Sequence, residues 1–183
     1  MLLLAGLGNP GAKYKNTPHN LGFDALDRLC SDFILNKKFQ ALIAKGIFLG
    51  REMLLAKPQT FMNLSGASIA AIANFYKIKP GDIWVFHDDI DLPLGKIRIS
   101  QNASPAGHRG VENILGALGT KNFVRFRLGA KTPVLEKIPS EDFVLKKFSK
   151  ADRTVVDKMI SLAIEAGQTA AESGLPAAMN KYN

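Results

Sequence analysis

Short apolar runs alternate along the chain with segments in which apolar residues recur at helical spacing. The first run, residues 2–5, is followed directly by glycines, which is typical of a buried strand. Runs of this kind predict strands at residues 2–5, 41–49, 53–56, 83–87, 96–100 and 123–128. Helical spacing predicts helices from Pro18 (capped by Thr17) to about 31–33, at 63–76, at 110–118, and from Ser149 to Gly174.

The order of these elements favours an α/β fold. Strands that alternate with helices predict one three-layer α/β/α domain over residues 1–183, with helices on both faces of a twisted sheet. The runs at 41–49 and 53–56 are close enough to form a hairpin through Gly50 and Arg51, so the sheet should be mixed rather than purely parallel. An acidic, turn-rich loop is expected from Asp88 to Gly95.

The composition is that of a folded protein with a basic surface. Hydrophobic residues make up 46% and charged residues 22%, which excludes an intrinsically disordered chain. The net charge of +8 favours polyanionic partners such as nucleic acids. One cysteine cannot form an internal disulfide, no apolar run approaches the roughly 18 residues that span a bilayer, and no basic leader precedes the first run. We therefore expect a cytoplasmic protein with no membrane segment and, because no heptad pattern is present, a monomer.

A glycine pattern follows the first predicted strand. Gly6, Gly8 and Gly11 fit G-x-G-x-x-G, which in dinucleotide-binding proteins opens a helix whose free N–H groups meet a pyrophosphate. Here Pro10 removes one donor, a loop follows, and the next strand with its ribose-binding acid is missing. The glycines are better interpreted as allowing tight backbone turns at a strand end, where ligands of α/β sheets bind.

Histidines and aspartates are the candidates for chemistry. His19, near the start of the first predicted helix, can serve as a general base if a carboxylate fixes its tautomer. Asp88 and Asp89 lie on opposite faces at a strand end, so either can point into a site, and periodicity does not choose between them. The other two histidines, His87 and His108, are explained equally well by a surface position or by a position in the core. The run from Asp88 to Asp91 also allows a hard metal ion, although no further ligands at suitable spacing support one.

Aromatic and basic residues indicate where RNA would bind. Phe61 and Met62 suit a platform for an unstacked base, and Asn63 is either a helix N-cap or a polar contact to a substrate. Basic residues cluster in the second half of the chain, where they are either solvated surface or a patch that follows phosphates. They are Lys96, Arg98, Arg109, Lys121, Arg125, Arg127 and Lys131.

Taken together, these motifs resemble the signatures of bacterial-type peptidyl-tRNA hydrolases. Residues 6–11 with Tyr14, His19 and Asn20 are similar to the amino-terminal signature of that family. Residues 58–66 (PQTFMNLSG) are similar to its second signature, residues 87–93 (HDDIDLP) to its third, and residues 178–183 to its closing segment. The similarity covers essentially the whole chain in order, which is far more specific than any single motif.

The resemblance implies hydrolysis of the ester that joins a peptide to the 3′-terminal adenosine of tRNA, which recycles tRNA after stalled or aborted translation. It implies a globular α/β fold with no cofactor and no metal. By the same resemblance, His19 is the general base that activates water, Asp88 orients it, and Asn9 places the water or the ester. The implied substrate contacts are Asn20, Asn63, Tyr14, Phe61 and Met62, and the implied tRNA phosphate contacts are Lys96, Arg98 and Arg127.

This chemistry is coherent without the resemblance, because ester hydrolysis needs only a water-activating base and amide donors for the developing oxyanion. No nucleophile elbow is present, so direct attack by water is the simpler mechanism. One position departs from the family, since Arg109 follows His108 where an asparagine is usual. Its guanidinium can bind a phosphate but cannot accept an amide hydrogen bond. The alternative function is that of a non-catalytic RNA-binding relative, such as a plastid splicing cofactor on the same scaffold.

Overall fold

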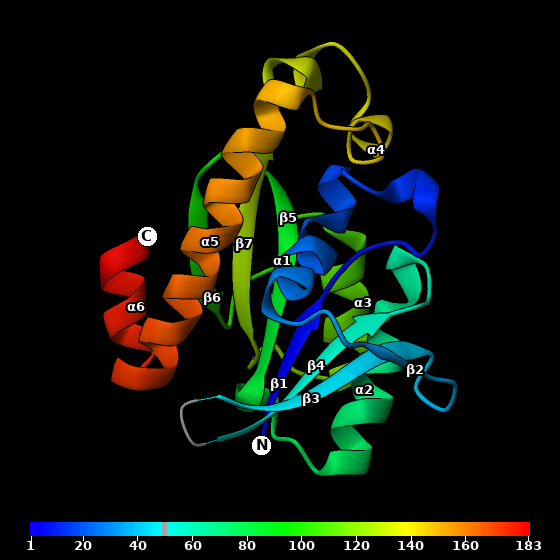
Figure 1. Ribbon diagram of the computed structural model, residues 1–183, viewed down its shortest axis with the longest axis vertical. Coiled ribbons are helices and arrows are strands. Elements are labelled where there is room, and N and C mark those ends of the chain that lie inside the picture. The colour runs from blue at the N-terminus through cyan, green and yellow to red at the C-terminus, as the bar shows by residue number, and fades with distance from the viewer. Residues whose placement is uncertain (49–50) are drawn as a thin grey trace.

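The computed structural model describes residues 1–48 and 51–183. The strands in this part of the chain form one mixed sheet in the order β2-β3-β4-β1-β5-β7-β6 (Figure 1). The pairs β1–β4, β1–β5 and β5–β7 are parallel, and the pairs β2–β3, β3–β4 and β6–β7 are antiparallel. The strands are β1 (Leu2–Gly6), β2 (Ile34–Asn36), β3 (Ala41–Phe48), β4 (Arg51–Pro58), β5 (Ile83–Pro93), β6 (Ile97–Gln101) and β7 (Val124–Lys131).

Helices cover both faces of this sheet (Figure 1). The α-helices are α1 (Leu21–Leu29), α2 (Ser65–Tyr76), α3 (Arg109–Leu118), α4 (Ser140–Phe143), α5 (Lys150–Ser173) and α6 (Leu175–Tyr182). Short 3-10 helices occupy Ala12–Tyr14, Pro18–Asn20, Met62–Leu64, Pro80–Asp82 and Pro133–Glu136. In the described part of the chain, no helix combines the length and apolar character that crossing a membrane requires.

The layers follow from the alternation of side chains along the strands. In β5, Trp84 and Phe86 pack with the helices α1 and α5, whereas Ile83 and Val85 pack with α2 and α3. Because the central strands are buried on both faces, their sequences are nearly continuous apolar runs rather than alternating ones. The predicted three-layer α/β/α arrangement with a mixed sheet is therefore confirmed.

Two predicted boundaries are wrong. The expected loop from Asp88 to Gly95 is largely strand, because β5 stays paired with β7 at Asp88 and Asp89 and, after an irregularity, again at Pro93. The first helix begins at Leu21 rather than Pro18, and it ends at Leu29. The Thr17 hydroxyl donates to the Tyr14 carbonyl instead of capping the helix, and a 3-10 turn intervenes. Of the predicted hairpin turn, Gly50 lies outside the described residues.

The helix ends show which of the predicted capping residues are correct. Ser149 caps α5 through a capping box with Asp152, and α5 ends immediately before Gly174, as predicted. Asn63 is not an N-cap: α2 starts two residues later, and Asn63 is exposed within a 3-10 turn. The short elements β2, α4 and α6 were not predicted, since each is too short to show a clear period.

Close backbone packing explains why Gly6 and Gly22, which lie next to the site, have no side chain. A Cβ atom at Gly6 would lie 2.2 Å from the Gly22 carbonyl oxygen, and one at Gly22 would lie 2.2 Å from the Phe86 carbonyl oxygen. The start of α1 therefore rests directly on the carboxyl end of β1 and on β5 at Phe86. Only Gly11 of the glycine pattern needs a positive φ, at 111°. The packing of Gly22 brings the turn before α1, which carries His19, next to Asp88 in the middle of β5.

Candidate active site

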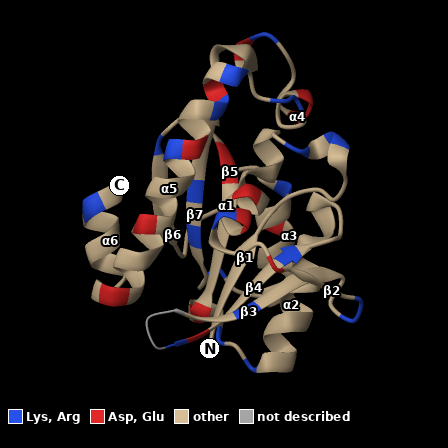
Figure 2. Ribbon diagram, viewed as in Figure 1, with Lys and Arg blue, Asp and Glu red and all other residues tan. Residues whose placement is uncertain are grey.

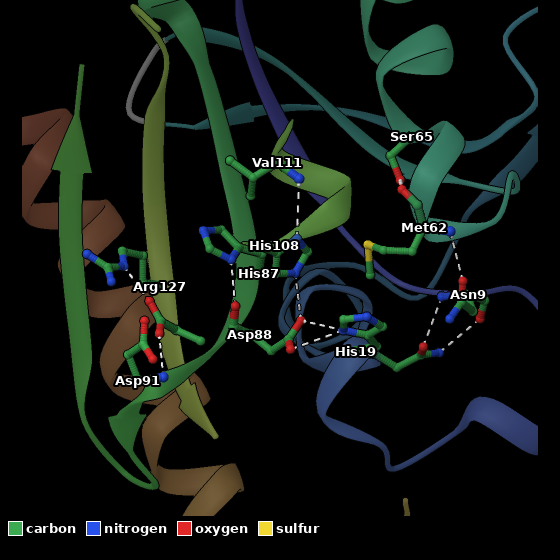
Figure 3. Close-up of polar contacts among 12 residues, drawn as sticks. Asn9, His19, Met62, Ser65, His87, Asp88, Asp91, His108, Val111 and Arg127 are labelled. Atoms are coloured by element: carbon green, nitrogen blue, oxygen red, sulfur yellow. Dashed lines mark hydrogen bonds and ion pairs between the residues drawn. The ribbon is translucent and has the colours of Figure 1, made fainter. Parts of the chain in front are cut away.

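Side chains from three segments meet at the carboxyl edge of the parallel strands, where ligands of α/β sheets bind. His19 lies in the 3-10 turn before α1, and Asp88 lies on β5. The Nδ1 atom of His19 is 3.1 Å from both carboxylate oxygens of Asp88 (Figure 3). The Asp88 residue is 1% exposed. The structure thus brings together two residues that are 69 positions apart in the chain.

This contact sets the tautomer and the basicity of His19. An ionised carboxylate only accepts hydrogen bonds, so Nδ1 of His19 carries the proton and Nε2 keeps its lone pair. Burial acts to lower the pKa of His19, but the Asp88 carboxylate outweighs it and raises the pKa above the ordinary value. Burial acts to raise the pKa of Asp88, but His19 and His108 together hold it well below its usual range. His19 therefore has the orientation and the partner of a general base.

His108 is a second partner of Asp88 that the sequence did not single out. Its Nε2 atom donates to Oδ1 of Asp88 at 2.9 Å, and its Nδ1 atom accepts from the Val111 N–H at 3.3 Å, which makes His108 the N-cap of α3. Figure 3 shows Asp88 between the two imidazoles. The available signal was the position of His108 two residues before the helix predicted at 110–118.

His87 packs against His108, with the two ring centroids 4.7 Å apart in an edge-on arrangement. It is buried, and its Nδ1 atom donates to the backbone carbonyl of Asp88 at 2.6 Å (Figure 3). Burial, assisted by the neighbouring His108, lowers the pKa of His87 well below the ordinary value. His87 is therefore a neutral residue in the wall of the site rather than a candidate base.

Metal binding fits these residues poorly. The ligand atoms of His19, Asp88 and His108 lie within 4.8 Å of one another, so they are the natural set to test. A histidine that binds a metal through Nε2 usually donates its Nδ1–H to an acceptor. Here Nδ1 of His108 instead faces the N–H donor of Val111. In the run from Asp88 to Asp91, the carboxylate of Asp89 is already used by the Asp91 N–H and by Arg127.

Asn9 is fixed on the other side of His19. Its Oδ1 atom accepts from the Met62 N–H at 2.9 Å, so the Nδ2 donor remains without a hydrogen bond within the described residues. Asn20 holds the Asn9 backbone from both sides, accepting from its N–H at 2.9 Å and donating to its carbonyl at 3.1 Å. Because both polar atoms of the Asn20 side chain are used in this way, the structure places Asn20 as a support for Asn9.

A cavity of about 510 Å³ opens in front of His19. Asn9, Met62 and Asn63 line it on one side, and the loop from Pro105 to His108 lines it on another. Phe61 stands at its rim and is 56% exposed. Arg109 and Glu141 also line the cavity. Tyr14, Asn20, Lys96, Arg98 and Arg127 are predicted site residues that do not line it.

The basic residues divide into exposed and buried ones. Arg98 of β6 and Lys96, which directly precedes this strand, are both exposed. Arg98 is paired in register with Arg127 of β7. The Arg127 Nε atom lies 2.5 Å from the Asp89 carboxylate. Arg125 is only 2% exposed and lines the cavity, so it is a buried residue of the site wall rather than part of a solvated patch. Figure 2 shows the basic positions of β7 beside the acidic positions of β5.

Known proteins are similar to this chain over nearly its whole length. The peptidyl-tRNA hydrolase family model matches residues 3–183. A peptidyl-tRNA hydrolase of Desulfitobacterium hafniense is 43% identical, with full coverage of both chains, and one of Carboxydothermus hydrogenoformans is 40% identical over all of this chain and 98% of the relative. The crystal structure of peptidyl-tRNA hydrolase from Acinetobacter baumannii superimposes with a TM-score of 0.92 at 31% identity, covering 100% of this chain and 94% of that one.

Fold and site together define a hydrolase of the α/β class with a histidine–aspartate pair at the carboxyl edge of its sheet. The match over nearly the whole chain makes the assignment specific: the chain belongs to the peptidyl-tRNA hydrolase family. The resemblance seen in the sequence motifs is therefore confirmed.

Proposed function

We propose that this protein cleaves the ester between a peptide and the 3′ end of tRNA by direct attack of a water molecule that His19 activates. Membership of the family supports the reaction. The observation that carries the mechanism is the contact of His19 Nδ1 with both oxygens of Asp88 at 3.1 Å. In the neutral imidazole, this contact holds the proton on Nδ1 and leaves the Nε2 lone pair available. His19 lines a cavity large enough for the terminal nucleoside and the ester.

The reaction follows from the positions of these groups. Nε2 of His19 takes a proton from water as the water oxygen attacks the ester carbonyl carbon. Asp88 stabilises the imidazolium that forms, and the Nδ2 donor of Asn9 stabilises the oxyanion of the tetrahedral intermediate. The bond to the 3′ oxygen then breaks, and His19 returns the proton to that oxygen. The products are a peptide with a free carboxyl group and a tRNA with a free 3′ hydroxyl.

The remaining predicted residues act in binding. Phe61 and Met62 offer an apolar surface at the rim of the cavity for the terminal base, and Asn63 and Tyr14 contact the peptide–ester region and the nucleotide. Asn20 acts by holding Asn9. The phosphate contacts are Lys96, Arg98, Arg109 and Arg127, of which Arg127 also pairs with Asp89. We further propose that the protein works as a monomer in the cytoplasm.

Hydrolysis of an N-blocked aminoacyl-tRNA tests the function. We expect release of the blocked amino acid at the same rate with and without a chelator, because the mechanism uses no metal. Binding of tRNA without release would instead favour the non-catalytic RNA-binding alternative. Loss of release in the chelator would show that a metal ion takes part, in contradiction to the proposed mechanism.

A further inference from the structure

An exposed ion pair lies at the cavity. Arg109 Nη2 is 3.4 Å from Glu141 Oε2. Arg109 is the first residue of α3, whereas Glu141 belongs to α4, and both residues line the cavity. The two side chains are 71% and 70% exposed, so the pair faces the solvent from which a substrate arrives.

The position of Arg109 has no explanation in helix stability. A cation at the first residue of a helix faces the positive end of the helix dipole, which is unfavourable. The guanidinium is too exposed to contribute packing. It is, however, well suited to bind an anion, because its planar fork of donors matches phosphate as well as carboxylate. The place of this residue is therefore better explained by binding than by folding.

The pair is weak enough to be exchanged. An ion pair that both partners expose to water is worth little, because the solvent screens it and two long side chains must be held in place. The backbone near Glu141 is fixed, since the Val144 carbonyl accepts from the His19 N–H at 3.0 Å. A rotation of the Glu141 side chain is sufficient to release Arg109, and the segment itself does not have to move.

We propose that Glu141 occupies, in the free protein, the place on Arg109 that a tRNA phosphate takes in the complex. Substrate binding then exchanges a carboxylate for a phosphate on the same guanidinium. Glu141 is thus a competitor that weakens tRNA binding and leaves the chemistry at His19 unchanged. This inference rests on the proposed function, because it requires a tRNA ligand.

A double-mutant cycle tests the exchange. The dissociation constant of uncharged tRNA is measured at fixed salt for the wild type, E141Q, R109Q and the double variant. We expect E141Q to tighten binding about two- to fivefold, the range that an exposed ion pair supports. R109Q should weaken binding, and adding E141Q to R109Q should have no larger effect than the control E112Q. Glu112 is exposed in the same first turn of α3, so E112Q removes an equal charge nearby.

Two results would overturn the proposal. One is equal tightening by E141Q with and without Arg109, which would mean that Glu141 acts only through the general field of the surface. The other is an E141Q variant that binds tRNA as the wild type does. Turnover of N-blocked aminoacyl-tRNA is measured separately for each variant. A protein that binds tRNA but never turns it over refutes the proposed function, while the binding cycle still decides the exchange.

Discussion

His108 Nε2 donates a hydrogen bond of 2.9 Å to Oδ1 of Asp88, and the same oxygen also contacts His19. Two imidazoles therefore share one buried carboxylate. His108 helps to hold the pKa of Asp88 well below its usual range. Because His108 and His19 share this charge, we expect His108 to limit how strongly Asp88 raises the pKa of His19. In the proposed mechanism, His108 is then a positioning residue that acts on the base through Asp88.

Replacing His108 tests this relationship through the pH profile. In the proposed mechanism, His19 works as a base only when neutral, so we expect kcat/KM to rise with pH through its pKa. Removing the His108 donor in H108L leaves more negative charge on Asp88 for His19, which raises the pKa of His19 further. We expect the acid limb of the profile to move to higher pH, and H108Q, which keeps a donor, to restore part of it. An unchanged acid limb in H108L would show that His108 has only a structural role.

Removing the charge of Arg109 should move the pH profile in the same direction as removing the His108 donor. Its positive charge acts to lower the pKa of His19. We therefore expect R109Q to raise the pKa of His19 in the free enzyme and to move the acid limb of kcat/KM to higher pH. The position of the limb on the pH axis reports this pKa, whereas weaker tRNA binding lowers the height of the whole profile. A shift of the acid limb to lower pH would contradict the expected sign. R98Q serves as the matched control, because it removes the same charge at an exposed position of β6.

The support that Asn20 gives to Asn9 is expected to matter for both stability and turnover. In N20A, the backbone N–H and carbonyl of Asn9 lose their buried partners, and each such unsatisfied group costs about 1–3 kcal/mol. We expect a lower free energy of unfolding and a larger loss in kcat than in substrate affinity. Urea unfolding and steady-state kinetics measure the two effects. N63A, at an exposed position, should unfold as the wild type does, and equal stability of N20A would refute the supporting role.

The side chain of Asn183 forms hydrogen bonds with the backbone of the edge strand β6. The Asn183 side chain accepts from the Ile99 N–H at 2.7 Å and donates to the Ile99 carbonyl at 2.9 Å, as a neighbouring strand would. N183A removes both hydrogen bonds, each worth about 0.5–1.5 kcal/mol net, so it should lower stability by about 1–3 kcal/mol and leave kcat unchanged. Thermal unfolding with a parallel activity assay checks this. A loss of activity without a loss of stability would contradict it.

The sequence predicted the layers well because the central strands are continuous apolar runs, and these depend little on distant residues. It did not show that Asp88, rather than Asp89, faces His19, since both directly follow the predicted strand at 83–87 and only the resemblance chose between them. The structure gives the reason: Asp89 is used by Arg127 and by its own turn, whereas Asp88 points between two imidazoles.

Long-range pairing limited the remaining predictions. His108 was missed because its contact with Asp88 joins a loop to a strand, and no local period records such a contact. The sequence predicts Arg125 on solvated surface or in a phosphate-binding patch, because charged residues are mostly exposed, but it is buried in the wall of the cavity. The proximity of Arg109 and Glu141, 32 positions apart, likewise depends on how α4 folds back toward α3.

The measurement that tests the central claim most directly is the single-turnover rate of N-blocked aminoacyl-tRNA hydrolysis by the wild type and by H19A, at saturating enzyme. General-base catalysis contributes roughly 10²–10⁴-fold. The account predicts that H19A loses activity in this range while its dissociation constant for tRNA stays near that of the wild type. Equal single-turnover rates for the two proteins would contradict the assignment of His19 as the base.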